Sequence, residues 1–103
     1  MGELTGKQKR YLRGLAHDLK PTVYIGKHGL TEALYESAEE ALEHHELIKV
    51  KFVDFKEEKL ELAAQIEDRL DCENVGKIGH HVLFFRQART PEHRQIKLPK
   101  VAG

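Results

Sequence analysis

The segment Gly26-Lys27-His28-Gly29 holds the residue types and spacing best suited to binding chemistry in this sequence. An expected strand precedes it and an expected helix follows it. Glycines let a backbone approach a ligand closely, and the free N–H groups and dipole of a helix N-terminus favour an anion. We therefore expect Lys27 and His28, at the tip of the loop, to contact phosphate. Because the bare pattern also arises by chance and in simple turns, the alternative interpretation is a turn without a ligand.

Basic residues elsewhere could extend such a loop into a larger surface. A GxxG loop grips a nucleotide backbone in KH domains, although there it joins two helices rather than a strand and a helix. The candidate basic residues lie in the first expected helix and in one strand: Lys7, Lys9, Arg10, Arg13, Lys49 and Lys51. Tyr11 is the one aromatic side chain expected on that surface, so backbone and shape contacts should dominate over base stacking.

Neither catalysis nor metal binding is indicated by the residue patterns. The phosphate-binding patterns GxxxxGK[ST] and GxGxxG are absent from the sequence, as is HExxH. The pairs His44-His45 and His80-His81 are adjacent, so they cannot share one face of a helix or strand, and Cys72 lacks a partner at ligand spacing. The many carboxylates cannot be distinguished from solubilising charge. We expect no catalytic residue, no metal and no cofactor.

Charge is distributed unevenly along the chain, although the net charge is zero. Residues 1–31 and 74–103 are basic, whereas residues 32–48 contain glutamates without any lysine or arginine, and residues 54–73 are acidic overall. Such asymmetry matters more for binding than the total does. It is compatible with a basic binding surface, with helix faces of mixed sign that are only solvated, or with acidic helices that dock a basic protein.

The length of 103 residues, with 40% hydrophobic and 33% charged residues, predicts a single folded domain over residues 1–103. No apolar run approaches the roughly 18 residues of a membrane span, and residues 1–20 lack the continuous apolar stretch of a secretory signal. The lone Cys72 permits a reducing compartment. We therefore expect a cytoplasmic, monomeric protein without a membrane or small-molecule partner.

Periodicity predicts the elements that must position the loop. Thr5 and Gln8 form a capping box for a first helix that ends before Pro21, and residues 22–25 form a short strand. A second helix runs from Thr31 to about His45, with glutamates at its outer face: Glu36, Glu39, Glu40 and Glu43. Residues 47–53 alternate as a strand, with Lys49 and Lys51 opposite the apolar positions.

The second half of the chain predicts a helix over residues 55–70 and two strands over residues 74–78 and 81–86. Gly79-His80 forms a tight hairpin turn between those strands, and the unbroken apolar run of the last strand indicates a central position in the sheet. Residues 87–103 should form an extended, partly mobile basic tail. The order α-β-α-β-α-β-β predicts an α/β fold, a two-layer α+β arrangement with a four-stranded mixed sheet packed against helices.

Several segments in order resemble the CRM domain family, in its stand-alone bacterial, YhbY-like form. The resemblance covers nearly all of residues 4–100. It is carried by the first helix, the GxxG loop, the segment around the second strand and the final hairpin: residues 7–17, 25–32, 43–51 and 78–86.

The resemblance implies an RNA-binding protein without enzymatic activity, with a fold similar to the C-terminal domain of translation initiation factor three. It implies association with the precursor of the large ribosomal subunit, and therefore a role in ribosome biogenesis. The family's functional loop corresponds here to Gly26, Lys27, His28 and Gly29. The basic surface would include Lys7, Lys9, Arg10, Arg13, Lys49 and Lys51. The rival expectation is an interaction module whose acidic helices dock a basic ribosomal protein.

Overall fold

Helices and strands alternate in the computed structural model of the chain, which describes residues 4–100. The helices are α1 (Gly6–Ala16), α2 (Glu32–His45), α3 (Lys59–Leu70) and the short 3-10 helix η1 (Pro91–His93). The strands are β1 (Val23–Ile25), β2 (Leu47–Phe52), β3 (Glu73–Ile78) and β4 (His81–Phe85). The predicted fold class and element order are confirmed.

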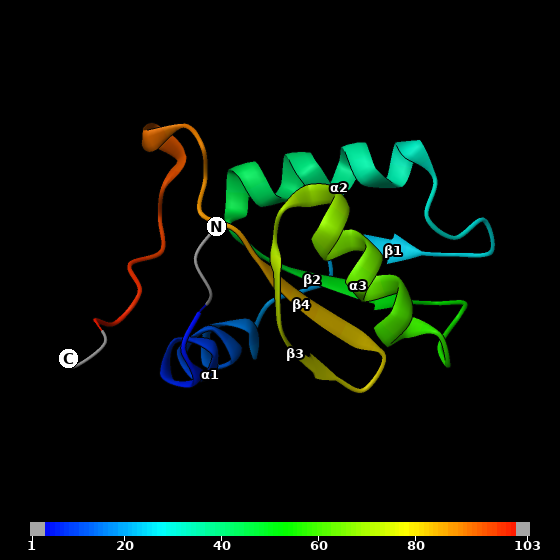
Figure 1. Cartoon of the computed structure of the whole chain (residues 1–103), viewed down its shortest axis with the longest axis horizontal. Helices are drawn as coiled ribbons and strands as arrows, with labels where there is room; N and C mark the ends of the chain where they lie inside the picture. Colours follow the sequence, from blue (N-terminus) through cyan, green and yellow to red (C-terminus); the bar gives the residue numbers. More distant parts are fainter. Residues whose placement is uncertain (1–3, 101–103) are drawn as a thin grey trace.

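The four strands form one mixed sheet in the order β1-β2-β4-β3 (Figure 1). β1 and β2 are parallel, whereas β4 pairs antiparallel with both β2 and β3. β4 is central, as its unbroken apolar run predicted, and Val82 to Phe85 are buried on both faces. The register of the hairpin pairs Ile78 with His81, which leaves Gly79-His80 as a two-residue turn.

Local signals set most helix ends. The Thr5 hydroxyl accepts from the Gln8 N–H at 3.1 Å and the Gln8 side chain accepts from the Thr5 N–H, as a capping box requires. The Thr31 hydroxyl caps α2 by accepting from the Leu34 N–H at 3.1 Å. The third helix begins later than predicted, at Lys59, because Phe55 has a positive φ of 55° that an α-helix cannot contain.

Hydrophobic cores lie on both faces of the sheet. Ile48, Val50 and Phe52 of β2 join α2 and α3 in the larger core. Leu47 of β2 and Leu83 of β4 pack with Leu12 and Ala16 of α1 on the opposite face. Helix α1 therefore adds a layer to the two that the sequence predicted, and Figure 1 shows it on the other side of the sheet from α2.

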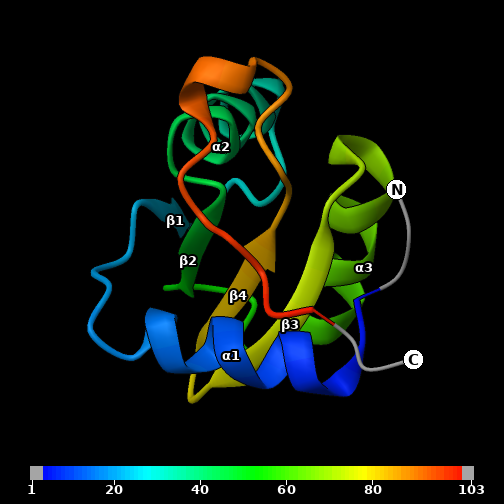
Figure 2. The same cartoon turned by 90° about the vertical axis from the view of Figure 1, so that its left-hand side faces the viewer.

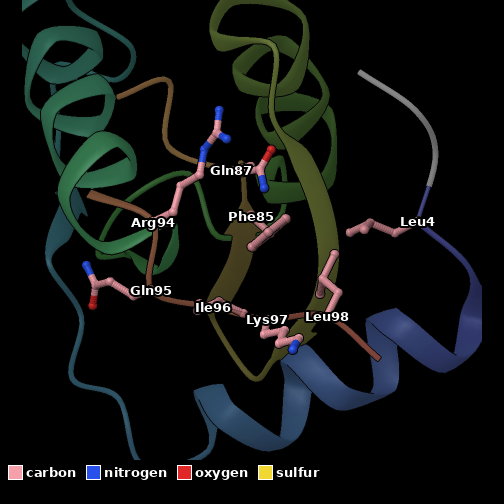
Figure 3. Close-up of a pocket in the computed structure, with 8 residues that line it drawn as sticks. All are labelled: Leu4, Phe85, Gln87, Arg94, Gln95, Ile96, Lys97 and Leu98. Carbon is pink, nitrogen blue, oxygen red and sulfur yellow. The ribbon is translucent and has the colours of Figure 1, made fainter. Parts of the chain in front are cut away.

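Residues 87–98 form a C-terminal strap that crosses the α1 face of the sheet. Figure 2 shows this segment descending from the end of α2 across β4 towards α1. Ile96 and Leu98 of the strap pack against the α1 core, and Figure 3 shows them with Leu4 and Phe85 around a pocket at that place. The sequence predicted an extended, partly mobile tail over residues 87–103, of which residues 101–103 lie outside the described part of the chain. In the described part, backbone donors and apolar side chains find partners that lie far away in the sequence.

Glu46 anchors the strap, and the sequence analysis overlooked this residue. Its side chain is completely buried, and its carboxylate accepts from the backbone N–H groups of Ala88 (2.7 Å), Gln95 (2.7 Å) and Ile96 (2.8 Å). Glu46 also terminates α2 with a positive φ of 64°. A non-glycine residue keeps such a backbone conformation only when other interactions offset its cost in free energy. The three hydrogen bonds of the Glu46 carboxylate are such interactions.

Glu43 makes a second attachment of the strap to α2. Its carboxylate accepts from the N–H groups of Arg89 at 2.8 Å and Thr90 at 3.1 Å, and it lies 2.7 Å from Nδ1 of His93. These hydrogen bonds, chiefly that from Arg89 and then that from His93, lower the pKa of Glu43 from 4.5 to about 2. Glu39 similarly pairs with Arg86 and Arg89. The outer face of α2 is therefore not merely solvated, as the sequence suggested.

The lowered pKa of Glu43 predicts an acid-sensitive contribution to folding. A carboxyl group whose pKa is depressed by folding stabilises the protein above its unfolded pKa and ceases to do so as pH falls through its folded pKa. We expect that contribution to be present above pH 4.5 and to disappear between pH 4.5 and about 2. Urea unfolding across this range should show a shallower pH dependence for Glu43→Gln than for the wild type. The exposed Glu36→Gln serves as the control and should retain the wild-type slope.

Candidate nucleic-acid interface

The loop between β1 and α2 is a tight turn that exposes Lys27 and His28. The Gly29 N–H donates to the Gly26 carbonyl at 3.0 Å, and the Thr31 N–H donates to the Gly29 carbonyl at 3.2 Å. Both side chains at the tip are exposed, and α2 begins three residues after Gly29 with its N-terminal dipole close to the loop. The geometry therefore offers a lysine, a histidine and a helix N-terminus on one accessible loop.

The two loop glycines have different structural roles. Gly29 adopts a positive φ of 66°, and a Cβ there would lie 3.5 Å from the Phe55 ring. Gly26 has no such conformation, and a Cβ there would meet no heavy atom within 4 Å. The glycine requirement expected at both positions holds conformationally at Gly29 alone, and the fold itself has room for a side chain at Gly26.

This difference predicts contrasting effects of alanine. Gly29→Ala should lower the free energy of unfolding by about 1–2 kcal/mol, because an L-residue strains at positive φ. Gly26→Ala should leave stability within about 0.5 kcal/mol of the wild type. Chemical denaturation of both variants measures this directly, and equal losses would show that the assigned loop conformation is wrong.

Backbone hydrogen bonds gather the GxxG loop, the end of β2 and the hairpin turn at one end of the sheet, which we call the loop end. The Val53 N–H donates to the Ile25 carbonyl at 2.9 Å, and the Phe52 N–H donates to the His80 carbonyl at 2.9 Å. Lys51 is exposed there, next to Tyr24 of β1 and His81 of β4 in the strand register. The loop and one of the two predicted strand lysines thus share one end of the molecule.

Additional cationic side chains surround the hairpin turn, and the sequence analysis did not select them. The pKa of His80 is lowered by desolvation and by the positive charges of Lys59 and Lys56, with smaller effects from His81 and Lys77. The segment after β2 lies beside the hairpin turn, because the Phe52 N–H donates to the His80 carbonyl, and within that segment the Lys59 ammonium donates to the Lys56 carbonyl at 3.0 Å. The sequence analysis overlooked Lys56 and Lys59 because residues 54–73 are acidic overall. The carboxylates of Asp54, Glu57 and Glu58 are also exposed in this segment.

Exposed aromatic rings also occur at the loop end. The side chain of Tyr24 is 56% exposed and that of Phe55 is 40% exposed, the latter beside Gly29. The sequence indicated Tyr11 as the one aromatic on the candidate surface. Tyr11 lies on the first helix, α1, as expected, but away from the loop end, and the rings of Tyr24 and Phe55 were overlooked. The loop end therefore combines ring surfaces with cations, the pairing that proteins use for unstacked bases.

The remaining predicted basic residues lie elsewhere. Figure 1 places α1 and the GxxG loop towards opposite ends of the long axis of the molecule. Lys7 and Arg10 are exposed on α1, whereas the Lys9 ammonium lies 3.4 Å from the Glu73 carboxylate. The Arg13 guanidinium donates to the Val75 carbonyl at 2.8 Å. Helix α1 therefore forms a separate basic surface, and not a continuation of the loop as the sequence suggested.

Lys49 requires a correction, because it does not share the exposed environment predicted for both strand lysines. Its side chain is only 8% exposed, whereas Lys51 is exposed. Alternation places both on the same face of β2, but the C-terminal end of α1 and the strap cover that face at Lys49 and leave it open at Lys51. Which face a strand residue occupies follows from the sequence, but how far that face is covered does not.

Residues 4–100 give little support for a metal site or for a reactive thiol. No group of three or more histidine, cysteine, aspartate or glutamate side chains in that part of the chain could hold a metal ion. Cys72 is buried, and burial raises its pKa to about 12, so the thiol is a poor nucleophile. None of the described helices has the length and apolar character needed to cross a membrane.

The chain combines a mixed sheet covered by helices with an exposed glycine turn and exposed cations near it, and comparison gives the family. Residues 4–86 match the model of the CRS1 / YhbY (CRM) domain, so the chain belongs to this family. It is 41% identical over 101 residues to a Haemophilus influenzae protein named RNA-binding protein, with 97% of this chain and 99% of that one covered. The resemblance drawn from the sequence is thereby confirmed.

Two further relatives extend the comparison. The Bacillus subtilis protein named Probable RNA-binding protein YqeI is 37% identical over 97 residues, which cover 93% of this chain and 99% of that one. The solution structure of the hypothetical protein SAV1595 from Staphylococcus aureus superposes with a TM-score of 0.78 at 39% identity, covering 94% of this chain and 100% of that chain. The similarity therefore extends over almost the full length in both sequence and fold.

Proposed function

We propose that this chain binds RNA through the loop end, with Gly26, Lys27, His28, Gly29 and Lys51 as its centre. The observation that carries the proposal is the convergence of the GxxG loop, the end of β2 and the β3–β4 turn at one end of the sheet. Lys56, Lys59 and Lys77 extend the set of cations available to phosphates there. Membership of the CRM family and the printed names of the relatives support RNA as the partner.

We further propose that the RNA is precursor ribosomal RNA of the large subunit, bound during ribosome assembly by a cytoplasmic monomer without catalytic activity. The family resemblance supports this assignment. Lys7, Lys9, Arg10 and Arg13 on α1 would form a second, separate contact with the same RNA or particle. Two cationic surfaces on different sides of one small domain suit a partner as large and folded as a ribosomal precursor.

Salt dependence tests whether phosphate contacts dominate binding. Affinity for large-subunit ribosomal RNA fragments should fall log-linearly with salt, with a slope of about −0.7 to −0.9 for each phosphate contacted. Several contacts at the loop end should therefore cost at least tenfold in affinity between low and moderately high salt. Fluorescence anisotropy with labelled fragments measures the slope. Affinity that stays constant over a several-fold salt range would contradict phosphate binding and favour the protein-docking alternative.

The rival function, docking of a basic protein by the acidic helices, has a smaller surface than the sequence suggested. Glu39, Glu43 and Glu46 are occupied by Arg86, Arg89 and the strap. Glu36 and Glu40 remain exposed on α2. A pull-down with purified pre-ribosomal particles tests this rival function. It would be established if association with the particles survives RNase treatment and is lost in the variant Glu36→Gln plus Glu40→Gln.

A further inference from the structure

Lys49 is a lysine whose stem is buried and whose ammonium reaches solvent. It lies in the middle of β2 and is 8% exposed, and among residues 4–100 the buried side-chain nitrogens left without a partner belong to Arg86 and not to Lys49. Its neighbours on the same face, Leu47 along the strand and Leu83 across it, are apolar. A lysine with a buried stem and a solvent-accessible ammonium presents its positive charge at a defined place on an apolar surface, where the anionic group of a ligand can meet it.

The Lys49 side chain lines a hollow between the C-terminal end of α1, β2 and the strap, which we call the Lys49 pocket. Its cavity volume is about 470 Å³, within the range of ligand sites. The walls are mostly apolar, formed by Leu15, Leu19, Leu47 and Ile96. Leu15 and Leu19 are 41% and 38% exposed, which leaves the apolar wall accessible from solvent.

Charge in the Lys49 pocket has one sign. Lys20 and His45 line it together with Lys49, and no aspartate or glutamate of the described residues does. Thr22 and Gln95 add polar groups that can donate or accept hydrogen bonds at its edge. The pocket therefore suits a ligand that combines an anionic group with an apolar body and a few hydrogen-bonding atoms.

We propose that the Lys49 pocket binds one unpaired nucleotide of a single RNA strand. Its phosphate would lie against Lys49 and Lys20, and its base against Leu15 and Leu19. This inference rests on the proposed RNA-binding function and names a second site for the same strand. A duplex keeps its bases stacked and paired, so insertion of a base requires single-stranded or looped RNA.

Continuity with the loop end favours a nucleotide over an isolated anion. Lys51 lies two residues further along β2 on the same face, about 6–7 Å away by strand geometry, and it is exposed. Tyr24 is its neighbour in register on β1, directly before the GxxG loop. A strand of RNA can therefore run from the loop past Tyr24 and Lys51 to the Lys49 pocket while it meets a cation or a ring at each step.

Nuclear magnetic resonance titration of the full chain with adenosine 5′-monophosphate tests the pocket without any longer RNA. We expect saturable shifts of the amide signals of Thr22, Lys49 and Gln95, and we expect Lys49→Met to abolish them. Lys100→Met is the control, an exposed lysine outside both proposed sites, and should retain the shifts. Inorganic phosphate and hexanoate are titrated in parallel, as an anion without a base and an apolar anion without a nucleoside.

Binding of a single-stranded oligonucleotide provides the second measurement. Lys49→Met should lower affinity about tenfold and reduce the salt slope by about 0.7. Its Tm should stay within a few degrees of that of the wild type, because methionine replaces the buried stem of the lysine with an apolar chain of similar length. Loss of RNA binding would then not be a consequence of unfolding.

Each arm has an outcome that overturns the proposal. Absence of nucleotide-induced shifts at the pocket in the wild type would do so, as would equal shifts from inorganic phosphate or hexanoate at the same concentration. Wild-type oligonucleotide affinity in Lys49→Met would also overturn it. If RNA binding depends on Lys27 and His28 but not on Lys49, this inference fails while the proposed function stands. If the wild type binds no RNA, the proposed function fails, and the nucleotide titration still decides whether the pocket exists as a site.

Discussion

Glu46→Gln is expected to lower the free energy of unfolding by about 2–3 kcal/mol, since the carboxylate that holds the strap is completely buried. Glutamine has nearly the same shape but presents an NH₂ group where the carboxylate has an oxygen. Oε1 accepts from Gln95 and Ile96, and Oε2 accepts from Ala88, so either orientation of the amide leaves at least one buried N–H facing another donor. In a domain of this size, such a loss should appear as a fall in Tm of about 10–20 °C.

Two further variants separate the carboxylate from the strained backbone of Glu46. Glu46→Ala removes the acceptors and keeps the cost of a positive φ, whereas Glu46→Gly removes both. We therefore expect Glu46→Ala to be less stable than Glu46→Gly. Glu40→Gln, an exposed change on α2, should stay within about 0.5 kcal/mol of the wild type. If Glu46→Gln matches Glu40→Gln, the strap is not anchored by this carboxylate.

Removal of three cationic groups at the loop end is expected to have the largest effect on RNA binding. In Lys27→Ala, His28→Ala, Lys51→Ala, two lysine–phosphate contacts and the histidine contact are lost together. At about 1 kcal/mol for each lysine, the affinity should fall about thirtyfold, and the salt slope should shrink by about two units. All three side chains are exposed, so the free energy of unfolding should change little.

The structure determines which control fits this experiment. Glu39 and Glu43, the residues of α2 that the sequence suggested as solvated charge, hold Arg86, Arg89 and the strap, so their replacement would affect folding. Glu36→Gln with Glu40→Gln changes exposed carboxylates instead, and RNA affinity should then hold or rise slightly as repulsion decreases. Two results together would contradict the assignment: normal RNA affinity in the triple variant, and loss of particle association in the Glu36→Gln, Glu40→Gln variant. They would show that α2, and not the loop end, is the interacting surface.

The elements and their order followed from the sequence because local interactions define them. Thr5 with Gln8 and Thr31 cap helices through contacts only three residues away, and alternation along Leu47 to Phe52 assigns side chains to faces by simple geometry. The Gly79-His80 turn fixed the hairpin register. The GxxG loop was visible for the same reason, since the strand, the turn and the helix that form it are contiguous in sequence.

Tertiary structure alone decided which charged side chains are free. A glutamate on a helix and a lysine on a strand look alike in sequence whether they face water or a distant segment. Glu43 and Glu46 meet the strap more than 40 residues later, and α1 with the strap covers Lys49 but leaves Lys51 open. The segment after β2, with Lys56 and Lys59, lies beside the turn at His80 only because β4 lies between β2 and β3. These contacts depend on chain segments whose pairing no local pattern encodes, so the sequence determined the framework and the fold determined the surface.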